Sequence, residues 1–182
     1  MNTAGTVYGT LGPAFASASR SSWVQDESMT PGGGSVTEKN RSSALRAAAE
    51  KRKELKQAVS DVETAIASAS ADPAWRVRLI VRLEELSGAL LRHVEEVEAP
   101  NGLLDELTSI APRLVNKIQH VRDEHPILCT RTSVAIGAVK EGAAVDLIRA
   151  DVLGLLSAIA THRQAGADLV YEGYEVDIGG GG

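Results

Sequence analysis

Residues 79–97 read LIVRLEELSGALLRHVEEV, and apolar side chains recur in this stretch at alternating steps of three and four residues. The members of the stripe are Leu79, Leu83, Leu86, Leu90, His93 and Val97. Steps of this kind place side chains on one face of an α-helix. The stretch therefore predicts an amphipathic helix that buries this face, with a histidine among the apolar residues.

Three further stripes with the same period occur in the chain. They run from Leu45 to Ile66, from Ala111 to Val139 and from Val145 to Leu169. The breaks between the stripes are ADP at 71–73, APNG at 99–102 and KEG at 140–142. Four amphipathic helices of roughly 25 residues, joined by short connections, predict an all-α fold, an antiparallel up-down four-helix bundle. Pro126 lies inside the third helix and is expected to kink or break it.

The chain divides into a tail, a helical part and a glycine end. Residues 1–40 are rich in Gly, Ser, Thr and Ala without a sustained period, which predicts a disordered tail. The bundle is expected over residues 41–178, with LLDELTSI at 103–110 as a short apolar segment between the second and third helices. The glycines at 179–182 predict a flexible end.

Charge and motifs exclude several classes of function. The formal net charge of −5 argues against nucleic acid and anionic membrane as partners, and no apolar run approaches the roughly eighteen residues of a membrane helix. The single cysteine, Cys129, cannot form an internal disulfide, which fits a cytoplasmic protein. No phosphate loop, CxxC or GxSxG motif is present, and Cys129 lacks an orienting group, so no catalytic set is predicted. A protein partner or a second copy of the chain remains open.

One large polar side chain interrupts each stripe. These side chains are Arg52, His93, His125 and His162. Counted from the turns at about 1.5 Å per residue, they lie at similar heights to within a turn or so, and could form one layer. A single histidine on an apolar face is usually structural, but each of three buried imidazoles needs a hydrogen-bond partner. A shared metal ion or shared carboxylates would satisfy several of them together.

Acidic residues near these histidines are the candidate additional ligands. Asp168 follows His162 by six residues, which rotates it about 120° around the helix, so it reaches the layer only from the flank. Glu96 follows His93 by three residues and is better placed by rotation than Glu98. His120 lies on a face beside the third stripe. Histidines and carboxylates that project from facing helices are how bundles hold iron or manganese.

Three segments resemble the hemerythrin-like (HHE cation-binding) family of four-helix bundles. They are LLRHVEEVEAP at 90–100, HVRDEHPIL at 120–128 and HRQAGAD at 162–168, within a similarity over roughly residues 42–178. The resemblance implies a non-heme di-iron centre held by histidines and two carboxylates, and a response to O₂, nitric oxide or redox state.

The ligand spacing departs from the family pattern. The aspartate that should follow the last histidine by five residues is Asp168, one residue late, and Arg52 occupies the slot of the first-helix histidine. The second-helix carboxylate position is Val97, and His120 and His125 are five residues apart in place of four. An intact di-iron site is therefore not expected.

Two hypotheses follow. In the first, a diverged hemerythrin-like protein holds a reduced metal site with His93, His125 and His162, and iron is the metal that the family implies. Asp168, His120 and Glu96 are its candidate extra ligands. In the second, a metal-free interaction or regulatory bundle pairs Arg52 with Asp168 or Glu96 in a buried Arg–His–carboxylate network.

Overall fold

The computed structural model describes residues 33–175, and this range contains only helices and their connections. In chain order the helices are α1 (Gly33–Ala67), α2 (Trp75–Val97), α3 (Leu103–Ile110), the 3-10 helix η1 (Pro112–Leu114), α4 (Val115–Lys140) and α5 (Val145–Glu175). The prediction of an all-α protein is confirmed for this range. None of the described helices is both long and apolar enough to cross a membrane.

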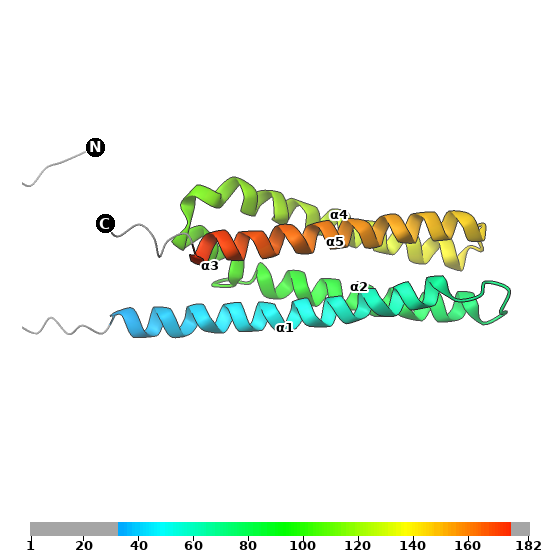
Figure 1. Ribbon diagram of the computed structural model, residues 1–182, viewed down its shortest axis with the longest axis horizontal. Helices are drawn as coiled ribbons and strands as arrows, with labels where there is room; N and C mark the ends of the chain where they lie inside the picture. Colours follow the sequence, from blue (N-terminus) through cyan, green and yellow to red (C-terminus); the bar gives the residue numbers. More distant parts are fainter. Residues whose placement is uncertain (1–32, 176–182) are drawn as a thin grey trace, which may run out of the picture. The chain divides into compact units, whose positions relative to one another are not determined.

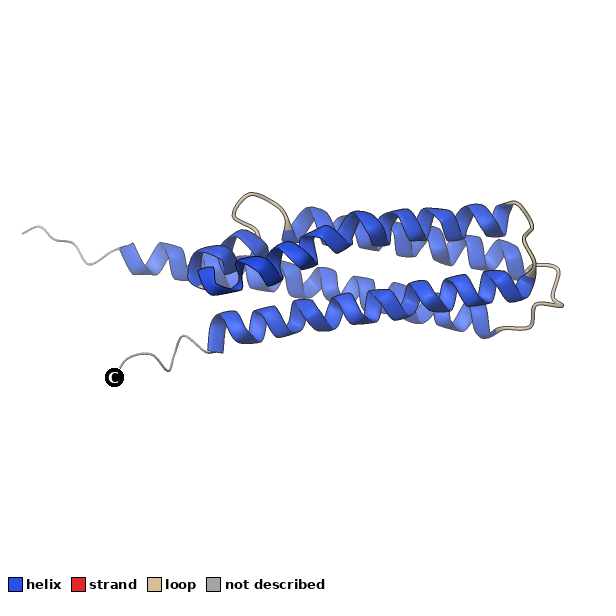
Figure 2. Ribbon diagram, turned by 90° about the horizontal axis from the view of Figure 1, so that it is seen from above, coloured by secondary structure: helices blue, strands red, loops and turns tan. Residues whose placement is uncertain are grey.

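The four long helices lie side by side, and each packs against two neighbours. α1 packs on α2, α2 on α4, α4 on α5 and α5 on α1. The chain reverses direction between α1 and α2 and between α4 and α5, and both connections lie at one end (Figures 1 and 2). At that end the Arg76 guanidinium donates a hydrogen bond to the carbonyl oxygen of Ala143, at 2.7 Å. Gly142, in the α4–α5 turn, has a φ of +80°, which glycine adopts without steric cost.

The segment LLDELTSI forms the short helix α3 at the opposite end. Leu103, Leu104 and Leu107 are buried, and α3 packs on all four long helices. An isolated helix of this length is unstable in water, so burial of these leucines against the bundle stabilises it. Gly102 precedes α3, and a Cβ at this position would lie 2.7 Å from the carbonyl oxygen of Ala99. The tight α2–α3 connection therefore requires glycine there.

Several helix limits differ from those expected. α1 begins at Gly33, several residues before the predicted start near residue 41, because adding turns to an existing helix needs no new nucleation. The rest of the predicted tail (1–32) and the predicted glycine end lie outside the described residues. α4 is not broken at Pro126, which is exposed. Long helices curve with their convex side toward solvent, and an outward-facing proline fits that curvature.

The buried side chains form two apolar clusters with a polar layer between them. The first cluster includes Leu55, Leu90, Leu128 and Ile159. The second includes Ala48, Val97, Val121 and Leu169. On each long helix one polar residue lies between a member of the first cluster and a member of the second: Arg52, His93, His125 and His162. The fold therefore places these four residues at the junction of the two clusters.

Candidate metal centre

Three histidines from three helices meet in this layer. His93 on α2, His125 on α4 and His162 on α5 are 6%, 1% and 2% exposed. Their ring centroids are 5.6 Å apart for His93–His125, 5.8 Å for His93–His162 and 4.7 Å for His125–His162. One ring nitrogen from each lies within 4.8 Å of the other two. The packing of the helices thus brings three nitrogen ligand atoms together in the protein interior.

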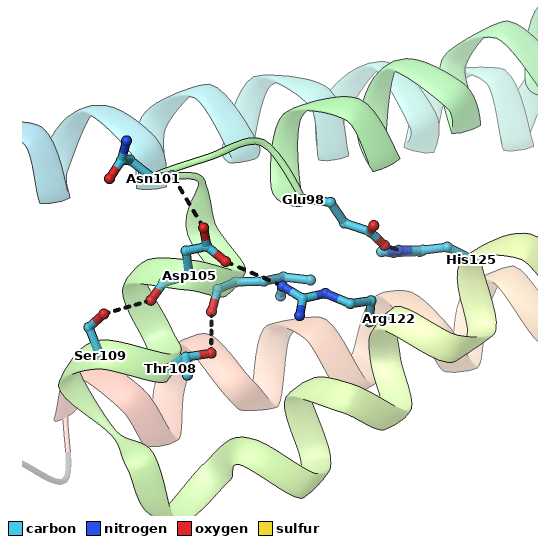
Figure 3. Close-up of polar contacts among 8 residues, drawn as sticks. Glu98, Asn101, Asp105, Thr108, Ser109, Arg122 and His125 are labelled. Atoms are coloured by element: carbon cyan, nitrogen blue, oxygen red, sulfur yellow. Dashed lines mark hydrogen bonds and ion pairs between the residues drawn. The ribbon is translucent and has the colours of Figure 1, made fainter. Parts of the chain in front are cut away.

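Two of the imidazoles are oriented by carboxylates. Nδ1 of His125 lies 2.5 Å from Oε1 of Glu98, at the end of α2. Figure 3 shows these two side chains pointing toward one another. Nδ1 of His162 lies 2.8 Å from Oε2 of Glu124, on α4. Because an ionised carboxylate only accepts hydrogen bonds, Nδ1–H donates in both pairs. In the neutral ring this leaves the lone pair on Nε2, which is the tautomer of a metal-ligating histidine with a carboxylate partner.

Two buried ring nitrogens have no partner among the described residues. They are Nδ1 of His93 and Nε2 of His125. Leaving a buried polar atom without a hydrogen bond costs about 1–3 kcal/mol. A cavity of about 30 Å³ adjoins all three rings, whereas one water needs roughly 10–15 Å³. The site therefore has both the room and the unpaired nitrogens to take an ion or water.

The cavity wall is mostly apolar, with two cationic side chains. The apolar part consists of Val97, Leu103, Leu104, Leu107, Val121 and Leu169. Arg52 of α1 and Arg163 of α5 also line the cavity, as does Gly166. No atom outside the helix's own nearby backbone lies within 4 Å of where a Cβ of Gly166 would be, so a side chain at this position would meet open space.

Burial favours the neutral, metal-binding form of His93 and of His125. Desolvation lowers the pKa of His93 from 6.5 to about 3, and positive charge on His125, His162, Arg52 and Arg163 acts in the same direction. Desolvation also lowers the pKa of His125, although its hydrogen bond to Glu98 opposes the shift. A neutral imidazole has a free lone pair for a metal ion, whereas a protonated one has none.

The other predicted ligands lie outside the cluster. Asp168 is exposed and accepts a hydrogen bond from Nε2 of Gln164 at 2.7 Å. The side chain of His120 is 74% exposed and lies 3.4 Å from Glu124. Glu96 lines a separate surface groove beside the α2–α3 connection. Because α5 is one continuous helix, Asp168 keeps its rotation of about 120° from His162 around the helix axis and so lies away from the cluster.

Glu98 and Glu124 are the carboxylates of this layer that the sequence did not predict. Glu98 was judged against His93 on its own helix, but its partner is His125 on α4. Glu124 lies one turn after His120 on α4, but it also accepts a hydrogen bond from His162 on α5. In the sequence, Glu98 directly follows the last residue of α2, and Glu124 directly precedes the buried His125. These positions are the sequence signals that could have pointed to the two glutamates. The partner on the neighbouring helix depends on packing.

The Arg52–Asp168 pair of the metal-free hypothesis is not formed. Arg52 lines the histidine cavity, while Asp168 bonds to Gln164. Burial lowers the pKa of Arg52. The polar layer is therefore built from histidine–glutamate pairs, with an arginine beside them.

Comparisons with protein-family models, with curated proteins and with solved structures found no match to this chain.

Proposed function

We propose that this protein is a hemerythrin-like, up-down four-helix bundle whose His93, His125 and His162 hold one non-heme metal ion, with iron as the first candidate. The observation that carries the proposal is the pair of unpartnered buried nitrogens, on His93 and His125, beside a cavity of about 30 Å³. The carboxylates of Glu98 and Glu124 support it, because they hold two rings in the ligating tautomer.

The donor set fits a single ion better than a pair. Three imidazoles suit iron, zinc and copper, while Arg52, which also lines the cavity, is a cation and a poor ligand. Metal–imidazole bonds of about 2.0–2.1 Å require two ligand atoms to lie within about 4.2 Å of each other. The present triangle, with edges up to 4.8 Å, would contract slightly on binding.

Each residue has a defined task in this proposal. His93, His125 and His162 bind the ion, Glu98 and Glu124 orient two of them, and the leucines of α3 exclude water. When bound, an iron ion with three protein ligands supplies open coordination positions for O₂, nitric oxide or electron exchange. The free, partly buried Cys129 is consistent with a cytoplasmic location.

Metal content tests the proposal directly. Protein purified without a His-tag, or reloaded anaerobically with Fe(II), is expected to contain about one ion per chain, because the described residues contain one such cluster. A ligand at a hundred times its Kd stabilises a protein by about 2.7 kcal/mol, so a chelator is expected to lower Tm by roughly 5–10 °C. Clearly substoichiometric metal that Fe(II) does not raise contradicts the proposal.

Removing the orienting carboxylate of His125 is expected to weaken metal binding without abolishing it. Glu98→Ala frees the His125 ring to take the other tautomer, and such partners contribute about 10–100-fold to metal affinity. Glu95→Ala is the matched control, because Glu95 is exposed on the same helix, three residues away. Competition titration with a chromophoric chelator measures both affinities. Equal affinities for the two variants would show that Glu98 does not act on the metal.

A second candidate function is a metal-free interaction or regulatory module. Its supporting observation is that the histidine–glutamate pairs satisfy part of the layer without an ion, while Arg52 adds positive charge beside it. In that case a chelator leaves Tm unchanged, and protein partners or a second copy of the chain are captured by the surface of the bundle.

A further inference from the structure

We propose that the cavity beside the three histidines binds a small planar oxyanion of formate size, held between the metal ion and the guanidinium groups of Arg52 and Arg163. This inference rests on the metal site proposed above. It adds a ligand class to that site and a task for two arginines that do not ligate the ion.

The balance of charge favours a bound anion. A divalent ion bound by three neutral imidazoles keeps its two positive charges, and Arg52 and Arg163 add two more. Glu98 and Glu124 supply two negative charges through their contacts with His125 and His162. The formal excess is about two positive charges in a mostly apolar interior, where uncompensated charge is costly. A bound anion offsets part of this excess.

The arginines are free to make this contact. Neither guanidinium has a carboxylate partner within residues 43–174, whereas Arg82 and Arg92, for example, are paired with Glu85 and Glu54. Both cavity arginines are only partly exposed. They reach the cavity from α1 and from α5, so they approach the layer from two helices.

Size and shape select the class of anion. The cavity volume of about 30 Å³ is only two to three times the roughly 10–15 Å³ that one water needs, so beside an ion held by the three ring nitrogens it admits at most a ligand of two or three heavy atoms. The planar fork of a guanidinium matches the two oxygens of a carboxylate-like group. Formate and nitrite meet both conditions, while phosphate and sulfate are too large and chloride offers no pair of oxygens.

The test uses protein loaded with Co(II), whose visible bands report both metal binding and any change in coordination. Adding sodium formate is expected to shift these bands in a saturable way, and sodium chloride is expected to have a much smaller effect. Arg52→Met keeps the apolar stem and is expected to raise the Kd for formate at least about tenfold while Co(II) stays bound. Arg52→Lys, which keeps the charge without the fork, is expected to give an intermediate Kd.

Arg163→Met is the second variant, in case Arg52→Met disturbs folding, and it is expected to weaken formate binding in the same direction. Arg82→Met is the control, because Arg82 is exposed on α2 and pairs with Glu85, so its Kd for formate is expected to match that of the parent protein. If Co(II) gives no bands, the metal site fails and the oxyanion site with it. If the bands form but formate leaves them unchanged, or binds both arginine variants as well as the parent, the metal site stands and this inference is overturned.

Discussion

His125→Ala is expected to lower metal affinity by about 100-fold, while His120→Ala leaves it nearly unchanged. A site with four ligands binds zinc with about 10–16 kcal/mol, so one ligand is worth about 3 kcal/mol, or about two orders of magnitude in Kd. His125 places a buried, unpartnered Nε2 beside the cavity, and its Nδ1 is held by Glu98. Isothermal titration of the metal-free proteins with Zn(II) or Fe(II) measures the difference.

The two histidines make a matched pair because both lie on α4, five residues apart. The side chain of His125 is 2% exposed, whereas that of His120 is 74% exposed and lies outside the cluster. Circular dichroism at the titration temperature checks that both variants are folded. If the two substitutions reduce affinity equally, the ion lies elsewhere and the three-histidine site is wrong.

The metal-free protein is expected to lose stability when the pH falls from 7 to 5. His93 has a pKa near 6.5 in the unfolded chain, but burial lowers its pKa to about 3 in the folded protein. At pH values between about 3 and 6.5, His93 binds a proton in the unfolded chain but not in the native state. The free energy of unfolding therefore falls by about 1.4 kcal/mol per pH unit in this window, or about 2 kcal/mol between pH 6.5 and pH 5.

Well above pH 6.5 the histidine is neutral in both states and has no effect of this kind on stability. The lowered pKa of His125 acts in the same direction as that of His93. Urea denaturation at pH 7 and pH 5, in the presence of a chelator, measures the loss. His93→Gln is expected to reduce the pH dependence, because it removes the group that becomes protonated on unfolding. Equal stability of the parent protein at both pH values would show that His93 is not held neutral by burial.

The stripes of residues 79–97 and of the three other segments were sufficient to predict an all-α protein. A buried helix face repeats every three or four residues, so its pattern is a local property of the chain. The same pattern identified Arg52, His93, His125 and His162 as polar residues in otherwise apolar stripes, and the structure brings the three histidines together. The short segment 103–110 was different, because only its burial against the long helices explains why it forms α3.

By itself, the sequence determined which faces of the long helices are buried and which polar residues they carry inward. The tertiary structure decided which acids join them. Asp168 and Glu96 share a helix with a histidine and yet lie outside the cluster, while Glu98 and Glu124 cross to a neighbouring helix and orient His125 and His162. Periodicity describes rotation about one helix axis. A contact between two helices also depends on their relative height, rotation and separation, which are set by the packing of the whole bundle.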